Sequence, residues 1–449
     1  MNVQNPARRG LRWMTLAVLA AVAALLASAC SVPEPPALVR QDAPPNAVTD
    51  PAKPCSRISS DAPAEQRPDV RPGFRFDRPT NTIEINSGEG VTLPALARAV
   101  NDPDALREVA PGEWLLAANI VVQAGASLQI AAPTVHWLKL SSSGPQFASV
   151  KAFGGSIDIT GACVTSWDNA QGRVDTEYAD GRGFLLARDG ATMTIDRAEL
   201  RYLGYGEVES YGLSWRTEGT TGKITNSVVS HLYYGLYSFE VGGLVVQDNE
   251  FHDNVLYGVD PHTHSHGMVI EGNRVHHNGK HGIILAEDCA DSVIRNNIVY
   301  ANQHHGIVLY LRSDRNVIEG NDTFGNAAQG INLNESSGNT VRGNRVYDNG
   351  ESGIGVAQTA ADNVVEQNQI RGNKQDGIRV VSEATQSTLR GNVIGENGRY
   401  GVYVDSDGAV DMAENTIFGS RAGVMLRSSS VAVGDNQVYD NHEADILNG

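Results

Sequence analysis

Short runs of alternating hydrophobic and polar residues recur along the C-terminal half of the chain with a period of 22–24 residues. Examples are residues 297–300 (Asn-Ile-Val-Tyr) and 306–309 (Gly-Ile-Val-Leu), which are rich in β-branched side chains. Such runs predict short strands, and a unit of this length leaves no room for a helix. A fixed period of 20–50 residues is typical of solenoids, propellers or arrays, and three short strands joined by tight turns fill one unit. We therefore predict an all-β parallel β-helix with coils of 22–24 residues.

Two series of residues keep this period in register over about 230 residues. The first series is an asparagine ahead of a hydrophobic residue: Asn249, Asn273, Asn297, Asn321, Asn344, Asn368, Asn392, Asn415 and Asn436. The second is a glycine followed by Ile, Val or Leu in most coils: Gly212, Gly235, Gly258, Gly282, Gly306, Gly330, Gly353, Gly377, Gly401 and Gly423. Asparagine tolerates a left-handed turn and can hydrogen-bond its neighbour one coil away. We interpret the asparagines as structural residues.

The repeat becomes irregular toward the N-terminus. Residues 93–100 (Leu-Pro-Ala-Leu-Ala-Arg-Ala-Val) have the spacing of a short amphipathic helix. A helix at the start of a solenoid is well placed to cover the open end of the core and to block edge-to-edge pairing. We expect an N-terminal cap region over residues 76–126 and the parallel β-helix over residues 127–449.

The first thirty residues have the pattern of an export signal. Arg8, Arg9 and Arg12 precede an apolar run at residues 14–29, and residues 26–30 (Leu-Ala-Ser-Ala-Cys) resemble a bacterial lipoprotein cleavage box. We predict a signal peptide over residues 1–30 with Cys30 as the lipidation site; an ordinary cleaved signal peptide is the alternative. The protein is then exported, and with the anchor it is a membrane lipoprotein facing the periplasm or the cell exterior.

Residues 31–75 carry ten of the eighteen prolines, interleaved with Ala, Asp and Ser. That composition predicts an extended, disordered tether between the lipid anchor and the folded part. If Cys30 is acylated, Cys55, Cys163 and Cys289 remain. Three cysteines cannot all pair within the chain, and no disulfide is predicted.

Composition and charge restrict the partners. Of the 449 residues 41% are hydrophobic, which is ample for a core, and the formal net charge is −17. The acidity argues against nucleic acid, because phosphate binding needs a basic face. It argues equally against a polyanionic polymer unless basic groups gather locally.

The candidate chemistry lies in one stretch, since ten of the twelve histidines fall between His231 and His305. One coil has Gly-Val-Asp-Pro-His at residues 258–262 where the next has Gly-Ile-Ile-Leu-Ala at residues 282–286. A carboxylate, a proline and an imidazole replace the apolar residues of the repeat. Rules broken inside an otherwise consistent repeat mark the place where function is expected.

Equal positions of successive coils form columns in a β-helix. Four residues after the repeat glycine the column is Arg216, Phe239, His262, Ala286, Tyr310 and Asn334. Two residues after it the column is Ser214, Tyr237, Asp260, Ile284, Val308 and Asn332. If the four-after position faces outward, Arg216, His262 and Tyr310 line one groove at intervals of about 10 Å.

A metal site is a second interpretation of the histidines. His262, His264 and His266 alternate along one segment and could share a face, with His281 or His305 as a further ligand. Pro261 disturbs that geometry, and no acidic triplet completes a standard site. We predict no cofactor and no obligatory metal, leaving an accessory role of calcium open. Three further histidines beside the asparagine turns are expected to be solvated loop residues: His276, His277 and His304.

Residues 257–262 (Tyr-Gly-Val-Asp-Pro-His) match the Tyr-Gly-x-Asp-Pro-His signature of alginate epimerases. The match extends through residues 265–267 (Ser-His-Gly), 280–284 (Lys-His-Gly-Ile-Ile) and, upstream, 232–235 (Leu-Tyr-Tyr-Gly). The chain therefore resembles the periplasmic mannuronan C5-epimerases of alginate-producing bacteria over about residues 80–440. The resemblance implies a right-handed parallel β-helix that converts mannuronate to guluronate, or a related uronate, within a polyuronate chain.

The resemblance also implies site roles. His262 is the expected base, with Asp260 and Tyr257 as supporting residues. The sequence departs from the family at two positions: Glu287 stands where the family has an arginine that neutralises the substrate carboxylate, and Thr263 replaces an acidic residue directly after the motif histidine. A carboxylate at position 287 would repel a uronate.

The implied reaction has clear requirements. Removing a hydrogen α to a carboxylate builds a dianion, so a cation must neutralise that carboxylate. An imidazole suits the base, and Tyr310, a histidine or water would return the proton on the opposite face. The candidates for substrate binding are Arg216, His266, Lys280, His281, Glu287 and Arg312. Among them the neutralising cation would be Arg216, Arg312, Lys280 or protonated His266.

Other functions fit the same sequence. The site would be a lyase if the glycosidic oxygen left after proton abstraction. A hydrolase would need two flanking carboxylates, for which Asp260 and either Glu287 or Glu240 offer themselves. A surface lipoprotein that binds glycan or serves an export complex is the non-catalytic alternative. For the enzyme we expect an anionic polysaccharide as partner, a membrane through the lipid anchor, no nucleic acid and a monomer.

Overall fold

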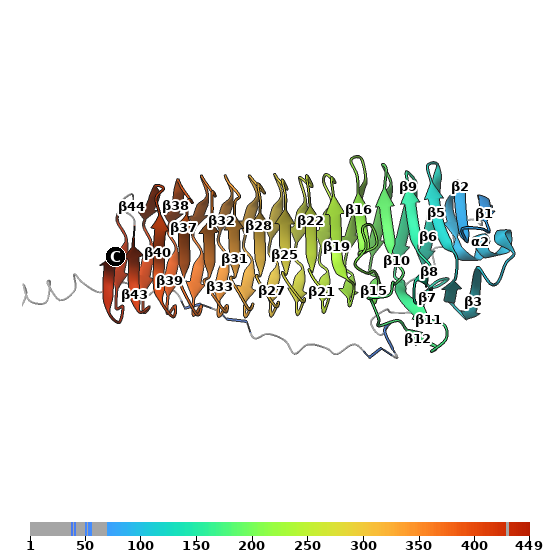
Figure 1. Cartoon of the computed structure of the whole chain (residues 1–449), viewed down its shortest axis with the longest axis horizontal. Coiled ribbons are helices and arrows are strands. Elements are labelled where there is room, and N and C mark those ends of the chain that lie inside the picture. The colour runs from blue at the N-terminus through green and yellow to red at the C-terminus, as the bar shows by residue number, and fades with distance from the viewer. Residues whose placement is uncertain (1–36, 39, 42–49, 52, 56–69, 428–430) are drawn as a thin grey trace, which may run out of the picture. The chain divides into compact units, whose positions relative to one another are not determined.

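The computed structural model describes residues 37–38, 40–41, 50–51, 53–55, 70–427 and 431–449. Three strands make each coil, and each strand pairs in parallel with its counterpart one coil on, as in sheets A, B and C of the central coils (Figure 1). The predicted all-β parallel β-helix with one short helix in the described part is confirmed.

Sheet A carries the candidate site. Its central strands are β16 (Gly212–Arg216), β19 (Tyr234–Phe239), β22 (Val259–His262), β25 (Ile283–Ala286), β28 (Ile307–Tyr310) and β31 (Ile331–Asn334). Sheet B includes β20 (Val245–Gln247), β23 (Val269–Glu271) and β26 (Val293–Arg295). Sheet C includes β15 (Glu199–Arg201), β18 (Val228–Ser230), β21 (Glu250–His252), β24 (Arg274–His276) and β27 (Ile298–Tyr300). The core lies between the three sheets and consists mainly of Ile, Val and Leu side chains that are fully buried.

The N-terminal end of the solenoid is covered as expected. Helix α2 (Leu93–Val100) begins at Thr92, whose side chain accepts a hydrogen bond from the Ala95 backbone N–H, and its apolar face joins the core. The strand before it, β2 (Thr82–Thr92), already pairs in parallel with β5 (Asn119–Gln123) and β6 (Ala126–Ala131). Strand β1 (Gly73–Asp77) adds to β2 in antiparallel fashion. The domain boundaries given above stay predictions.

The asparagines form a buried ladder, as interpreted from the sequence. Asn297 shows the pattern: its Nδ2 donates to the Ile270 carbonyl and to Asn321 Oδ1 of the next coil, both at 2.9 Å. One part of the interpretation was wrong. The left-handed backbone belongs to the preceding residue, such as Asn296 with φ 55°, and not to the ladder asparagine. The turn places the ladder side chain inside the coil, where its amide satisfies backbone groups that would otherwise be unpaired.

The repeat glycines are required by close packing between coils. A Cβ placed on Gly282 would lie 2.7 Å from the Gly306 carbonyl oxygen and 2.8 Å from Asn302 Nδ2. Real Cβ atoms essentially never come this close to rigid neighbours. The second series of the sequence pattern therefore reflects a shortage of space, since Gly282 has no left-handed backbone.

One disulfide was missed. Cys55 is bonded to Cys163 in β11 (Cys163–Asp168), across 108 residues of sequence, while Cys289 is free and buried. Arg40 and Gln41 also contact the solenoid, and Gln41 Nε2 donates to Asp322 Oδ2 at 2.7 Å. The predicted leader and the lipidation site at Cys30 lie outside the described residues. No helix in the described part of the chain is long and apolar enough to cross a membrane.

Candidate active site

The outward columns predicted from the sequence are present on sheet A. Successive coils pair Arg216 with Phe239, Phe239 with His262, His262 with Ala286, Ala286 with Tyr310 and Tyr310 with Asn334. The alternate residues of β25 and β28, Ile283, Leu285, Ile307 and Leu309, point into the core and are fully buried. The side chains four and two residues after the repeat glycine therefore face outward.

His262 ends strand β22 and is held on two sides. Its ring stacks on Tyr237 of the preceding coil, with centroids 5.7 Å apart and planes 28° apart. Its Nδ1 lies 2.7 Å from Thr263 Oγ1. Partial burial lowers the pKa of His262, opposed by the charge of Glu287 and assisted by that of Arg216. A neutral imidazole at physiological pH results, which suits a base.

Asp260 shares the outward face of β22 but is almost fully buried. Among the described residues no hydrogen-bond partner reaches its Oδ1. Burial raises the pKa of this carboxyl well above its ordinary value, and the nearby charge of Lys280 only partly opposes the shift. Asp260 therefore favours the protonated form, which can donate a hydrogen bond.

Tyr257 lies at the edge of this column, where Lys280 Nζ donates a 2.7 Å hydrogen bond to its hydroxyl. The Tyr257 ring packs against an outward apolar cluster of Ile284, Ala286 and Val308. Tyr310 follows one coil beyond Ala286, with 40% of its surface exposed. His262 and Tyr310 are thus separated by one small side chain, with an apolar patch beside it.

The four candidate cations differ in their surroundings. Arg312 is bound by Asp288 through two 2.7 Å contacts and so carries a neutralised charge. Arg216 is buried over the Tyr237 ring, at 4.6 Å from its centroid, and forms none of the ion pairs found among the described residues. Lys280 is exposed and has a neutral phenol as its hydrogen-bond partner. His266 is exposed in the turn toward sheet B, with Nδ1 on the His264 carbonyl. Arg216 and Lys280 are the cations best able to meet an anion.

A ladder of rings runs alongside the column, one residue before each repeat glycine. Its members are Tyr211, Tyr234, Tyr257, His281 and His305, with successive centroids 4.5, 5.2, 5.4 and 5.2 Å apart. His281 Nδ1 accepts from the His305 backbone N–H, and His305 Nδ1 accepts from that of Gln329. Burial lowers the pKa of His281 to about 2 and that of His305 to about 3. Both rings are neutral donors through Nε2. This ladder could have been predicted from the sequence, because its members keep the repeat spacing.

The metal interpretation is not supported for His262, His264 and His266. Strand β22 ends at His262, and Thr263 and His264 have positive φ, so the three histidines do not alternate along one strand. Nitrogens of His281, His304 and His305 do lie within 4.8 Å of one another. However, the Nδ1 atoms of two of them already accept backbone hydrogen bonds, which places a proton on the other nitrogen. This cluster is a poor metal site in the tautomers present.

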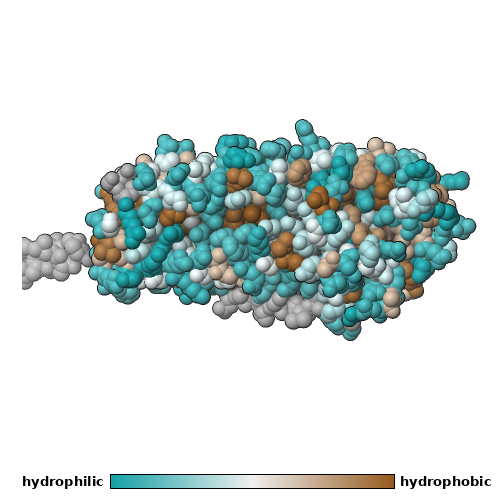
Figure 2. Space-filling model, in the orientation of Figure 1, coloured by the Kyte–Doolittle hydropathy of each residue, from teal (hydrophilic) through white to brown (hydrophobic). Residues whose placement is uncertain are grey.

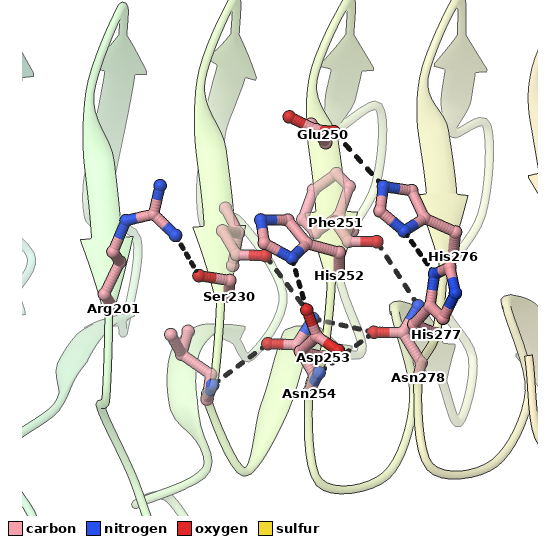
Figure 3. A network of polar contacts seen from close by, with 12 residues as sticks. Arg201, Ser230, Glu250, Phe251, His252, Asp253, Asn254, His276, His277 and Asn278 are labelled. Carbon is pink, nitrogen blue, oxygen red and sulfur yellow. Dashed lines mark hydrogen bonds and ion pairs between the residues drawn. The ribbon is translucent and has the colours of Figure 1, made fainter. Parts of the chain in front are cut away.

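A second group of histidines lies on sheet C (Figure 3). His252 Nδ1 lies 2.7 Å from Asp253 Oδ2, and His276 Nε2 lies 3.2 Å from Glu250 Oε1. The rings of His252 and His276 stack with centroids 5.2 Å apart. The expectation that His276 is a solvated loop residue was wrong, because it occupies a column of stacked rings that is buried. His277, half-buried, bonds to it, and His304 is exposed as expected.

Comparison with known proteins agrees with the fold and the motif. A family model described as "Right handed beta helix region" matches residues 182–313 and 309–394. A mannuronan C5-epimerase of Pseudomonas syringae pv. tomato is 27% identical over 309 residues, covering 57% of this chain and 56% of the relative. AlgG of Azotobacter vinelandii, a mannuronan C5-epimerase, is 29% identical over 192 residues, covering 40% and 35%. The chain thus spans about half, or less, of these relatives' length.

Solved structures extend the similarity over most of the solenoid. A crystal structure of the periplasmic alginate epimerase AlgG superposes with a TM-score of 0.65 at 25% identity, covering 82% of this chain and 85% of that chain. A variant of the same epimerase gives a TM-score of 0.66 at 26% identity with the same coverage. Fold and site together define a right-handed parallel β-helix protein with a tyrosine- and histidine-lined outer face. Within that class, the chain is similar to the periplasmic mannuronan C5-epimerases, in agreement with the resemblance of its motif.

Proposed function

We propose that this protein is a C5-epimerase that converts mannuronate, or a related uronate, within a polyuronate chain. The observation that carries the proposal is the placement of His262 and Tyr310 in one outward column, on either side of the small Ala286. A base and an acid that flank one sugar can remove the C5 proton from one face and return a proton to the other.

The reaction requires charge neutralisation at the substrate carboxylate. Lys280 beside Tyr257, and Arg216 beyond Tyr237, support this role because no carboxylate is bonded to either in the described part of the chain. Burial raises the pKa of Asp260, which favours a neutral hydrogen-bond donor over a repelling charge at this position. A cation at the carboxylate stabilises the enolate-like intermediate as the His262 Nε2 takes the proton.

The surroundings of the site support a long, hydrated substrate. The ring ladder has a spacing close to that of the coils, so it can accompany a polymer that lies along the solenoid. The outward column that contains Ser214 continues toward the N-terminus of the solenoid. Ser214 pairs with Leu186, and Leu186 pairs with Lys151 one coil further on. Lys151 lines a cavity of about 990 Å³ with Asn169 and Tyr205. On the face of the solenoid drawn in Figure 2, hydrophobic patches are small and separated by hydrophilic side chains, so this face offers no large apolar surface to a partner.

Deuterium incorporation tests the proposal. The protein is incubated with polymannuronate in deuterated water, and deuterium at C5, guluronate content and unsaturated chain ends are measured by NMR and mass spectrometry. We expect C5 deuterium without cleavage, its loss in His262→Ala and its retention in His277→Ala, a histidine of the turn that follows strand β24. Unsaturated ends would identify a lyase. Absence of exchange on every uronan tested, with His262→Ala binding like the unchanged protein, would instead support the non-catalytic glycan-binding alternative.

We further propose that the protein is exported and anchored through Cys30, with the domain boundaries given from the sequence. The periplasmic epimerases that it resembles support export. Fractionation tests the anchor: the unchanged protein should appear with membranes, and Cys30→Ser should move it to the soluble periplasmic fraction. If the protein without substitutions is found in the soluble fraction, lipidation at Cys30 is refuted.

A further inference from the structure

Thr263 and Glu287, the two positions at which the sequence departs from the family motif, are in contact. Thr263 Oγ1 donates a 3.1 Å hydrogen bond to Glu287 Oε2 and lies 2.7 Å from His262 Nδ1. Glu287 Oε2 itself lies 3.9 Å from His262 Nδ1. The three side chains therefore form a hydrogen-bonded series that runs from the Glu287 carboxylate through the Thr263 hydroxyl to the His262 imidazole. Both turns that bring them together have positive φ, 27° at Thr263 and 61° at Glu287.

The number of protons available in this hydrogen-bonded series determines the tautomer of His262. A hydroxyl has one proton, and an ionised carboxylate only accepts hydrogen bonds. The Thr263 proton is used on Glu287, so the hydroxyl oxygen must accept from His262. The Nδ1 atom of a neutral His262 therefore carries the proton, and Nε2 keeps its lone pair.

The remaining contacts of His262 keep the ring in this orientation. The Tyr237 ring stacks against it from the preceding coil. Arg216 lies over the same tyrosine ring and contributes positive charge. In the described residues no hydrogen bond is made by Nε2, which is the nitrogen left to meet a ligand. The side chain remains 28% exposed, so a substrate can reach it.

We propose that Glu287 is a positioning residue, which acts through Thr263 to hold His262 with a proton on Nδ1 and a basic Nε2. The proposal rests on the proposed function, in which His262 is the base. It replaces the expectation that Glu287 contacts the substrate. A carboxylate bonded to a threonine hydroxyl directs its charge toward the imidazole, where it also stabilises the imidazolium formed after proton abstraction. The neutralising cation must then come from elsewhere, such as Lys280 or Arg216.

Two variants remove the carboxylate or the hydroxyl without a large change of shape: Glu287→Gln and Thr263→Val. Thr263→Ser keeps the hydroxyl, and Glu335→Gln makes the same acid-to-amide change two coils away at the equivalent repeat position. We expect Glu287→Gln and Thr263→Val to lower kcat for C5 exchange about 10- to 100-fold, with little change in KM. This is less than the about 10²- to 10⁴-fold contribution of a general base itself, because His262 stays in place. Thr263→Ser and Glu335→Gln should remain within about twofold of the unchanged protein.

Nitrogen NMR tests the inference independently of activity. In protein labelled with ¹⁵N-histidine, His262, assigned by its disappearance in His262→Gln, should show a protonated Nδ1 and an unprotonated Nε2. Glu287→Gln and Thr263→Val should convert this signature to the other tautomer or to a mixture. A protonated Nε2 in the unchanged protein, or an unchanged signature in both variants, would overturn the proposal. If the tautomer responds but no uronan undergoes exchange, the positioning role stands and the proposed function fails.

Discussion

Replacing one asparagine of the buried ladder should strongly destabilise the solenoid around it. Asn297→Ala removes four hydrogen bonds: two that its Nδ2 donates to Ile270 and Asn321, and two that its Oδ1 accepts from the backbone and side-chain N–H groups of Asn273. At about 1 kcal/mol each, the loss is about 4 kcal/mol. Partner groups left buried without hydrogen bonds would increase this figure.

The assay is unfolding in urea, monitored by the rate of backbone hydrogen exchange in the peptides that cover residues 270–325. Long repeat proteins can lose cooperativity, so exchange in the affected coils is compared with exchange in distant coils of the same sample. The control is Asn334→Ala, which makes the same change on the outward face of sheet A, where the side chain is half-buried. We expect a loss below about 1 kcal/mol for the control. Equal losses in the two variants would refute the view that the ladder amides stabilise the fold through their buried hydrogen bonds.

The remaining predictions concern the site. Tyr310→Phe should lower the rate of C5 exchange about 10²- to 10⁴-fold if its hydroxyl returns the proton, and an unchanged rate would transfer that role to water or another residue. His281 has a pKa of about 2 in the folded state, far below that of an exposed histidine, so it contributes stability that is complete above about pH 6.5 and is lost as the pH falls. In His281→Gln the decline of unfolding free energy between pH 6 and pH 4 should be shallower by at most about 1.4 kcal/mol per pH unit, and an identical slope would contradict the buried neutral ring. The pKa of Asp260 is raised by burial, so its contribution is greatest below the pKa of the unfolded chain and is lost as the pH rises toward the folded value. Asp260→Asn should therefore remove a contribution that falls with pH, so the slope of unfolding free energy against pH above about pH 4, measured by denaturant titration, should become more positive; an unchanged or more negative slope would contradict protonated burial.

The catalytic interpretation of this face depended on both sequence and structure. The columns with Arg216, His262 and Tyr310 could be predicted from the repeat alone, and their strand pairing is as predicted. The environments of the candidate cations could not be predicted from the repeat. Arg216 is buried among aromatic rings, and Arg312 is paired with Asp288. Such details determine which cation can meet a substrate carboxylate.

Repetition is the reason that so much of the fold can be derived from the sequence. One coil is one period, so residues with equal positions in the period become neighbours, and the register of parallel strands follows directly from the spacing of the asparagines and glycines. The short helix at residues 93–100 was also predicted, because its apolar spacing is local.

Contacts between residues that the repeat period does not relate were decided only by the tertiary structure. The Cys55–Cys163 disulfide joins the chain ahead of the solenoid to an early coil, and no period relates the two positions. The link from Glu287 through Thr263 to His262 depends on two turns with left-handed backbone, whose geometry decides which atoms meet. Sequence spacing determines which residues share a column. Turn geometry, burial and side-chain packing determine which nitrogen of His262 carries the proton.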